Sequence, residues 1–134
     1  MRTSLGRRHT VRLDSEQGSA VAESVMVMAL LAVLFAAILQ FGLIIHVRNT
    51  VIDAASAGAR YGALGDRTPA DGAARARELV SSSIPGGETA VVSSGVIDQA
   101  VPMVTVTVRT QMPMVGFLRG PVELEATGHA YRFE

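Results

Sequence analysis

The chain of 134 residues contains no cysteine and no tryptophan, and all of its basic residues are arginine. Without cysteine there is no disulfide, no thiolate nucleophile and no Cys-based zinc site. Aromatic residues make up only 4% of a chain that is 49% hydrophobic, so the apolar weight comes from Ala, Val, Leu, Ile and Met. The length allows one small domain, with a modest core if a membrane segment takes part of it.

The sequence also lacks the spacings that catalytic and metal sites need. His9, His46 and His129 stand far apart and show no ligand spacing. Neither a Gly-rich phosphate loop nor a G-x-S-x-G elbow is present, and the acidic residues are scattered rather than paired. Outside residues 1–18 there is no dense basic cluster of the kind that binds nucleic acid. We therefore expect no enzyme, no metal or other cofactor, no small-molecule substrate and no nucleic-acid ligand.

One long apolar run, residues 25–45, dominates the first half of the chain. Its 21 residues include a single polar side chain, Gln40, and thirteen are Leu, Ile, Val or Phe. A helix of this length spans about 31 Å, close to the roughly 30 Å hydrocarbon layer of a bilayer. Those thirteen side chains contribute about −4 to −8 kcal/mol to insertion. A buried core helix is the alternative, but the remaining chain is too short to cover it. We predict a transmembrane helix over residues 19–47.

Charged residues beside this run predict its orientation. Arginines cluster ahead of it, at positions 2, 7, 8 and 12, whereas only His46 and Arg48 follow directly. The positive-inside rule places the N-terminus in the cytoplasm and residues 48–134 outside, in a single-pass protein of the cytoplasmic membrane. A secretory signal peptide is an alternative, but its apolar part would be about 7–15 residues long and followed at once by an A-x-A site. The nearest such triplet, residues 55–57, lies ten residues beyond the run.

The junction ahead of the run combines a glycine with an acid. A polar, Arg-rich leader ends at Gly18, and Glu23 follows five residues later at the membrane edge. An acid at this position is costly in lipid and requires an explanation. Glu23 could lie among the headgroups, or Ser19 or Ser24 could begin the helix with Glu23 near its positive end.

The same junction carries a family resemblance. Gly, four residues, Glu and then about 20 apolar residues behind a basic leader form the type III signal pattern of prepilins, so the chain resembles the type IV pilin class. Residues 20–23 (AVAE), 41–42 (FG) and 57–61 (AGARY) resemble the TadE-like family of pseudopilins, which belong to tight-adherence (Flp) pilus systems. The best-matched part covers residues 18–64. Ser24 departs from the Phe or Tyr that many members carry after the Glu.

The resemblance implies a role for the junction. A membrane-embedded prepilin peptidase would cut between Gly18 and Ser19 on the cytoplasmic side, so residues 1–18 would form a removable leader. Glu23 would become the fifth residue of the mature chain. A carboxylate at this depth seeks a cation. The new α-amino group of a neighbouring subunit would supply one, and the pair would set the axial register between packed helices.

Residues 48–134 predict an extracytoplasmic α+β domain. The long helix continues outward from the membrane to about Leu64, and residues 65–69 break it. Thr68 or Asp71 caps a short helix over residues 70–83. Alternating or β-favouring patterns then predict a small antiparallel sheet of about three strands, at residues 89–93, 101–110 and 122–133.

Two features of this domain allow more than one interpretation. Ala54, Gly58 and Gly62 recur every four residues, and such rows let helix backbones approach closely. This row packs either against another subunit or against the domain's own sheet. The apolar segment 112–118 is an interaction site, a membrane-surface contact or a cover over the sheet edge.

Together these observations predict a TadE-like minor pilin or pseudopilin that takes part in assembling a tight-adherence (type IVb) pilus. Its expected partners are prepilin peptidase, other pilins or pseudopilins, the assembly machinery and the lipid bilayer. Both a place in the fibre and a place in the membrane fit this prediction. The alternative is an uncleaved, membrane-anchored binding module that docks another envelope protein. The N-terminal residue of the membrane form, Met1 or Ser19, distinguishes the two.

Overall fold

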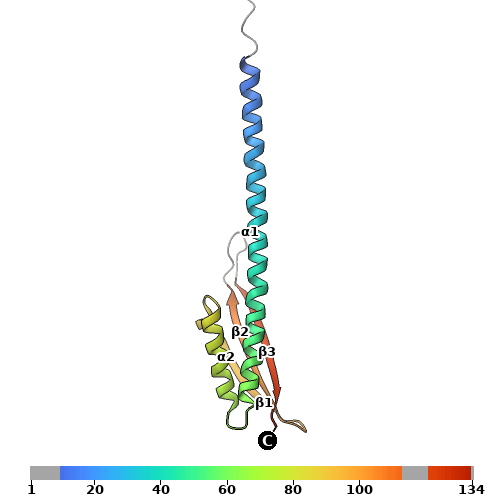
Figure 1. The fold of residues 1–134 in the computed structure, drawn as a ribbon, viewed down its shortest axis with the longest axis vertical. Helices are drawn as coiled ribbons and strands as arrows, with labels where there is room; N and C mark the ends of the chain where they lie inside the picture. Colours follow the sequence, from blue (N-terminus) through green and yellow to red (C-terminus); the bar gives the residue numbers. More distant parts are fainter. Residues whose placement is uncertain (1–9, 113–120, 134) are drawn as a thin grey trace, which may run out of the picture. The chain divides into compact units, whose positions relative to one another are not determined.

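The structure is a computed structural model that describes residues 10–112 and 121–133. Two helices are followed by a short 3₁₀ turn and three strands (Figure 1). The elements are α1 (Thr10–Gly62), α2 (Pro69–Ser83), η1 (Gly87–Thr89), β1 (Val91–Ile97), β2 (Met103–Met112) and β3 (Val122–Tyr131). The predicted α+β class and order of elements are confirmed. The chain divides into two compact units, residues 1–39 and 40–134, and the described part of the first unit is residues 10–39 of α1.

The start of α1 corrects one sequence interpretation. α1 is helical throughout Thr10–Gly62, so it passes through Ser19 and Ser24 without interruption. The Ser24 hydroxyl donates a hydrogen bond to the Ala20 carbonyl at 2.9 Å, the i−4 bond of a serine in a helix interior. The interpretation in which Ser19 or Ser24 begins the helix is therefore wrong.

Helix α2 begins with a reciprocal cap. The Thr68 hydroxyl accepts a hydrogen bond from the Asp71 backbone N–H at 3.2 Å, and the Asp71 carboxylate accepts one from the Thr68 N–H at 2.8 Å. Pro69 occupies the first turn, where a missing N–H leaves no partner unsatisfied. Hydrogen bonds from the Thr68 backbone and then from its hydroxyl lower the pKa of the Asp71 carboxyl. Of the two caps that the sequence allowed, Thr68 is the N-cap, and Asp71 lies inside the first turn, where its side chain completes the capping box.

The three strands form one antiparallel sheet with β2 in the centre. β1 extends to Ile97, four residues beyond the predicted Ser93, because Gly95 pairs with Thr105 and Ile97 with Met103. β2 begins after Pro102, which could not donate to the ladder. β3 ends at Tyr131, and the next backbone N–H, that of Arg132, bonds the Pro102 carbonyl at 2.8 Å.

One face of the sheet supplies the core. Val104, Val106 and Val108 on β2 are fully buried, while Thr105 and Thr107 between them are half-buried on the other face. The helices contribute small side chains to the same core. Those of α1 are Val47, Val51, Ala54, Ala55 and Ala59, and those of α2 are Ala73, Ala76 and Val80. Because these side chains are mostly Ala and Val, the domain depends on close approach of its elements.

Candidate functional site: the apolar segment of α1

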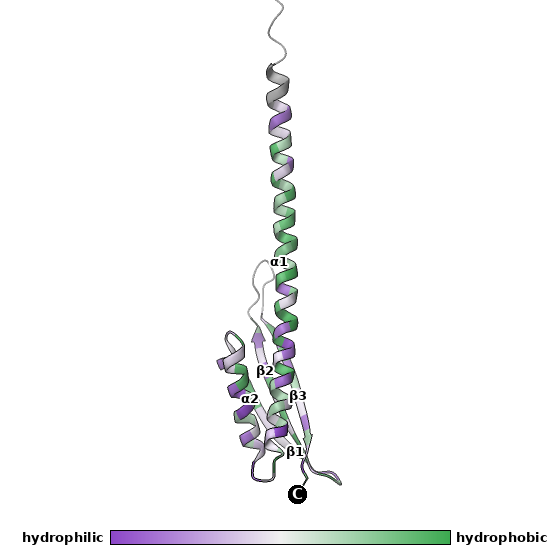
Figure 2. Ribbon diagram, viewed as in Figure 1, coloured by the Kyte–Doolittle hydropathy of each residue, from purple (hydrophilic) through white to green (hydrophobic). Residues whose placement is uncertain are grey.

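The N-terminal part of α1 exposes large apolar side chains in every direction. Every side chain from Ser15 to Leu39 is exposed, and Met28 and Leu30 reach 73% and 69%. Figure 2 shows this part of the helix as predominantly hydrophobic. Within the described ranges it belongs to the one helix long and apolar enough to cross a membrane, and none of its most apolar window is buried. A core helix would be covered, so the core-helix alternative is wrong.

Burial changes within a few residues where the apolar run ends. Ile45 is 43% exposed, but Val47 and Val51 are only 3% and 1% exposed and belong to the core. His46, Arg48 and other polar residues alternate with them on the outer side of α1. The helix thus changes at this point from apolar on all sides to amphipathic, which is the pattern of a helix packed on a domain.

The junction residues lie on exposed helix. Gly18, Ser19 and Glu23 are exposed on α1, and a Cβ built at Gly18 meets nothing within 4 Å. Packing within the described chain therefore does not require glycine at position 18. The ion pairs that the structure describes join Arg67 to Asp66, Arg75 to Glu78 and Arg109 to Glu125, and Glu23 is in none of them.

The row of small residues on α1 packs inside its own domain. Ala54 is 2% exposed. A Cβ at Gly58 would lie 2.6 Å from the Gly72 carbonyl oxygen and 2.8 Å from the Ala76 Cβ. One at Gly62 would lie 3.1 Å from the Thr68 carbonyl oxygen. The row therefore packs within its own domain, but chiefly against α2 rather than against the sheet, whose Val106 lies 3.4 Å from a Cβ at Gly58.

Two further glycines lie where other elements approach α1 closely, and they were not singled out from the sequence. A Cβ at Gly72 of α2 would collide with the Gly58 carbonyl oxygen, and one at Gly128 of β3 would collide with the Ala55 backbone. Gly72 lies inside a helical pattern and Gly128 inside a strand pattern, where an isolated glycine indicates a close backbone approach. That signal was available in the sequence.

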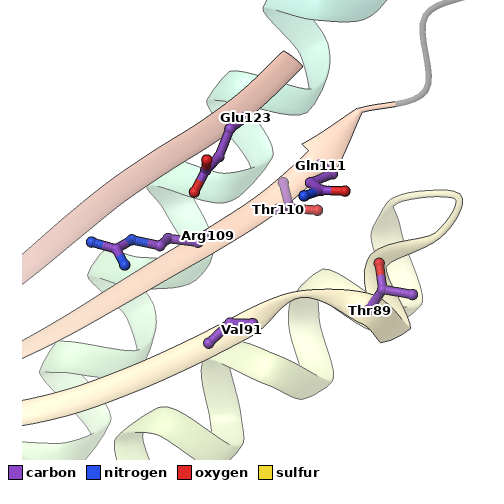
Figure 3. Close-up of a pocket in the computed structure, with 6 residues that line it drawn as sticks. All are labelled: Thr89, Val91, Arg109, Thr110, Gln111 and Glu123. Carbon is purple, nitrogen blue, oxygen red and sulfur yellow. The ribbon is translucent and has the colours of Figure 1, made fainter. Parts of the chain in front are cut away.

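The domain offers little for chemistry. A depression of about 370 Å³ beside β2 is lined by Thr89, Val91, Arg109, Thr110, Gln111 and Glu123, whose side chains are drawn in Figure 3. Glu125 accepts a hydrogen bond from Arg109 at 2.6 Å and raises the pKa of its guanidinium, so this cation is already paired. In the described part of the chain no three His, Cys, Asp or Glu residues gather to hold a metal ion. His46 and His129 are separate and exposed.

Comparison with known families identifies the segment just described. Residues 18–60 match the family model described as TadE-like protein. The resemblance inferred from residues 18–64 is thereby confirmed. Searches of curated proteins and of solved structures returned no match.

The TadE-like segment joins the two parts of α1. It begins at Gly18, includes Glu23 and the whole exposed apolar run, and ends at Arg60 in the packed part of the helix. The strands lie outside it, as does the predicted apolar segment 112–118. Of that segment Met112 ends β2 and is buried, and residues 113–118 lie outside the described residues.

Proposed function

We propose that this protein is a structural component of a tight-adherence pilus system, a TadE-like minor pilin or pseudopilin held in the cytoplasmic membrane by α1. The observation that carries the proposal is that the family match and the exposed apolar run fall on the same part of one helix. The TadE-like match, residues 18–60, contains the entire apolar run, in which every side chain up to Leu39 is exposed. Lipid is the environment that such a surface requires.

The membrane would meet α1 between Glu23 and Ile45. On this proposal residues 19–47 form the transmembrane helix, and the α+β domain of residues 48–134 lies outside the cytoplasm. Support for the boundary comes from Val47 and Val51, where core packing begins. Support for the orientation comes from the arginines of residues 1–18.

Prepilin peptidase would remove residues 1–18 by cutting the exposed Gly18–Ser19 bond. Gly18 has only a hydrogen atom as its side chain, which lets a peptidase approach the backbone closely. Glu23 has no cation among the ion pairs that the structure describes. In the assembled state it would pair with the α-amino group of a neighbouring pilin or pseudopilin, which explains an acid at the edge of an apolar helix.

The test is N-terminal sequencing and intact mass of the membrane-extracted protein, with and without a co-expressed prepilin peptidase. We expect a start at Ser19 that depends on the peptidase. Gly18→Val should leave the full-length precursor. Gly42→Val is the matched control, since a Cβ at Gly42 also meets nothing within 4 Å, and this variant should be trimmed normally.

Two results would contradict the processing part of the proposal. One is a start at Met1 in both samples while a control prepilin is cut, which would favour an uncleaved anchor that docks another envelope protein. The other is normal trimming of the Gly18→Val variant. Glu23→Gln should still be trimmed but should fail to enter or support the pilus, because it lacks the charge.

A further inference from the structure

The bond that the proposed function requires to be cut lies inside a helix. α1 is helical from Thr10 onward, so eight helical residues precede Gly18. In an α-helix the Gly18 carbonyl accepts a hydrogen bond from the Ala22 N–H, and the Ser19 N–H donates one to the Ser15 carbonyl. Both halves of the Gly18–Ser19 amide are therefore engaged in the helix.

Hydrolysis of this bond requires both groups to leave their helical partners. The oxygen of a water molecule adds to the Gly18 carbonyl carbon, the C–N bond breaks, and the Ser19 nitrogen takes up both protons of that water. The products are a Gly18 carboxylate and a Ser19 ammonium group. During the addition, the carbonyl oxygen needs donors aimed at its developing charge. The Ala22 N–H points along the helix axis, and the adjoining turns block the approach of a second chain.

The residues around the bond make helix opening easy. The side chains of residues 15–24 are exposed, so the helix here is held by its own backbone hydrogen bonds with little help from packing. Gly18 is among the least favourable residues for a helix interior, and Ser19 is only moderate. The Ser24 hydroxyl also shares the Ala20 carbonyl, which weakens that turn. The next glycine along α1 is Gly42.

From this geometry we infer that prepilin peptidase cuts α1 only after the helix unwinds between Glu16 and Ala22, so that local helix stability determines the cleavage rate. The inference rests on the proposed function. The inference gives Gly18 a second role. Besides being small, Gly18 weakens the helix at the bond that is cut. Residues that never touch the peptidase then influence processing through their helix propensity.

A matched pair of substitutions tests the inference in the full-length, membrane-embedded chain. Glu16→Ala and Glu16→Gly remove the same charge and differ mainly in helix propensity. If opening precedes cutting, the Gly variant is cut up to about fivefold faster than the Ala variant, the ratio that about 1 kcal/mol of propensity gives. Ala22→Gly should be cut faster than the unmodified chain by a similar factor. Initial rates are measured by mass spectrometry with purified prepilin peptidase.

The controls separate helix opening from direct contact with the peptidase. Ala37→Gly makes the same change in propensity far from the bond and should leave the rate unchanged. Amide hydrogen exchange near Ser19 should be faster in the variants that are cut faster. Equal rates in all variants, or acceleration at only one of positions 16 and 22, would overturn the inference while trimming at Ser19 upheld the proposed function. No trimming of the unmodified chain beside an active control would instead contradict the proposed function.

Discussion

Residues 25–45 and residues 47–62 share one helix but differ in side-chain size and in what covers them. In the first region the large side chains up to Leu39 are exposed on all sides, with Leu30 at 69% and Phe35 at 63%, and Ile44 is partly buried against the core. In the second region the buried side chains are small, and Ala55 and Ala59 are fully buried. Only one face of the second region is covered, since Arg48, Asp53 and Arg60 are exposed.

On the proposed function, the difference reflects what each region contacts, lipid in the first and other elements of the domain in the second. A fluid acyl layer adapts to any apolar outline, so large Leu, Val and Phe side chains can point in every direction. A fixed partner such as α2 or β3 has its own shape, and close approach then requires Ala or Gly at the point of contact. The glycines at 58, 72 and 128 mark those points. A substitution that is tolerated in one region should therefore fail in the other.

The largest expected effect is on membrane insertion. Placing arginine at both Leu31 and Leu34 changes the insertion free energy by about 3 kcal/mol per site, which together offsets most of the favourable total. Both side chains are exposed, so the fold of residues 40–134 should survive. Extraction of membranes with alkaline carbonate should move the double variant from the pellet to the soluble fraction.

A charge added to the other region is the control for that result. Asn49 is exposed on the packed part of α1, so Asn49→Arg should remain in the pellet. Retention of the Leu31→Arg/Leu34→Arg variant in the membrane would contradict the assignment of α1 as the anchor.

The second effect is on the stability of the folded domain. Gly58→Ala places a Cβ 2.6 Å from the Gly72 carbonyl oxygen and should destabilise the domain by about 1–3 kcal/mol, a typical cost of overpacking. Thermal unfolding of the full chain in detergent, followed by circular dichroism at a wavelength that reports the sheet, measures the change. Gly42→Ala on the same helix meets open space and should be neutral or slightly stabilising. Equal losses in both variants would show that the α1–α2 crossing is not close-packed.

Much of the fold could be predicted because its signals are local. The Thr68–Asp71 pair predicts the start of α2, and the alternation of Val104, Val106 and Val108 predicts a half-buried strand. The extension of β1 to Ile97 could not be predicted in this way. Ser93, Ser94 and Gly95 do not alternate in hydrophobicity, and they become strand because β2 supplies hydrogen bonds.

The candidate site also has features that could be predicted from the sequence and features that could not. The spacing of Gly18, Glu23 and the apolar run is visible in the sequence and coincides with the TadE-like match. The conformation of that junction could not be predicted, because serines such as Ser19 and Ser24 are residues that commonly cap helices. Both serines lie inside α1, which extends upstream to Thr10 through polar and charged residues. The intramolecular partner of Gly58 also had to come from the structure, since a small-xxx-small row looks the same whichever helix it meets.

A smaller effect is expected at the cap of α2. Thr68→Ala removes the hydroxyl that accepts the Asp71 N–H bond and should lower the unfolding free energy of the domain by about 1 kcal/mol. Thr68→Ser keeps a hydroxyl at the same position and should restore most of that loss. Denaturant unfolding of the full chain in detergent measures both values. The same loss in the Ala and Ser variants would indicate that the methyl group of Thr68, rather than its hydrogen bond, stabilises this turn.

The smallest expected effect is a pH dependence from Asp71. Its pKa in the folded domain is lowered by hydrogen bonds from Thr68, so the folded state favours the ionised carboxylate. A group with a lowered folded pKa stabilises fully above its unfolded pKa, near 3.8 here, and this contribution disappears as pH falls through the folded value. The unfolding free energy of the unmodified chain should therefore exceed that of Asp71→Asn at pH 6. The gap should narrow as pH falls below about 4, where other carboxylates titrate equally in both proteins and cancel in the difference. A gap that stays constant from pH 6 to pH 3 would show that the charge of Asp71 contributes nothing to the stability of the fold.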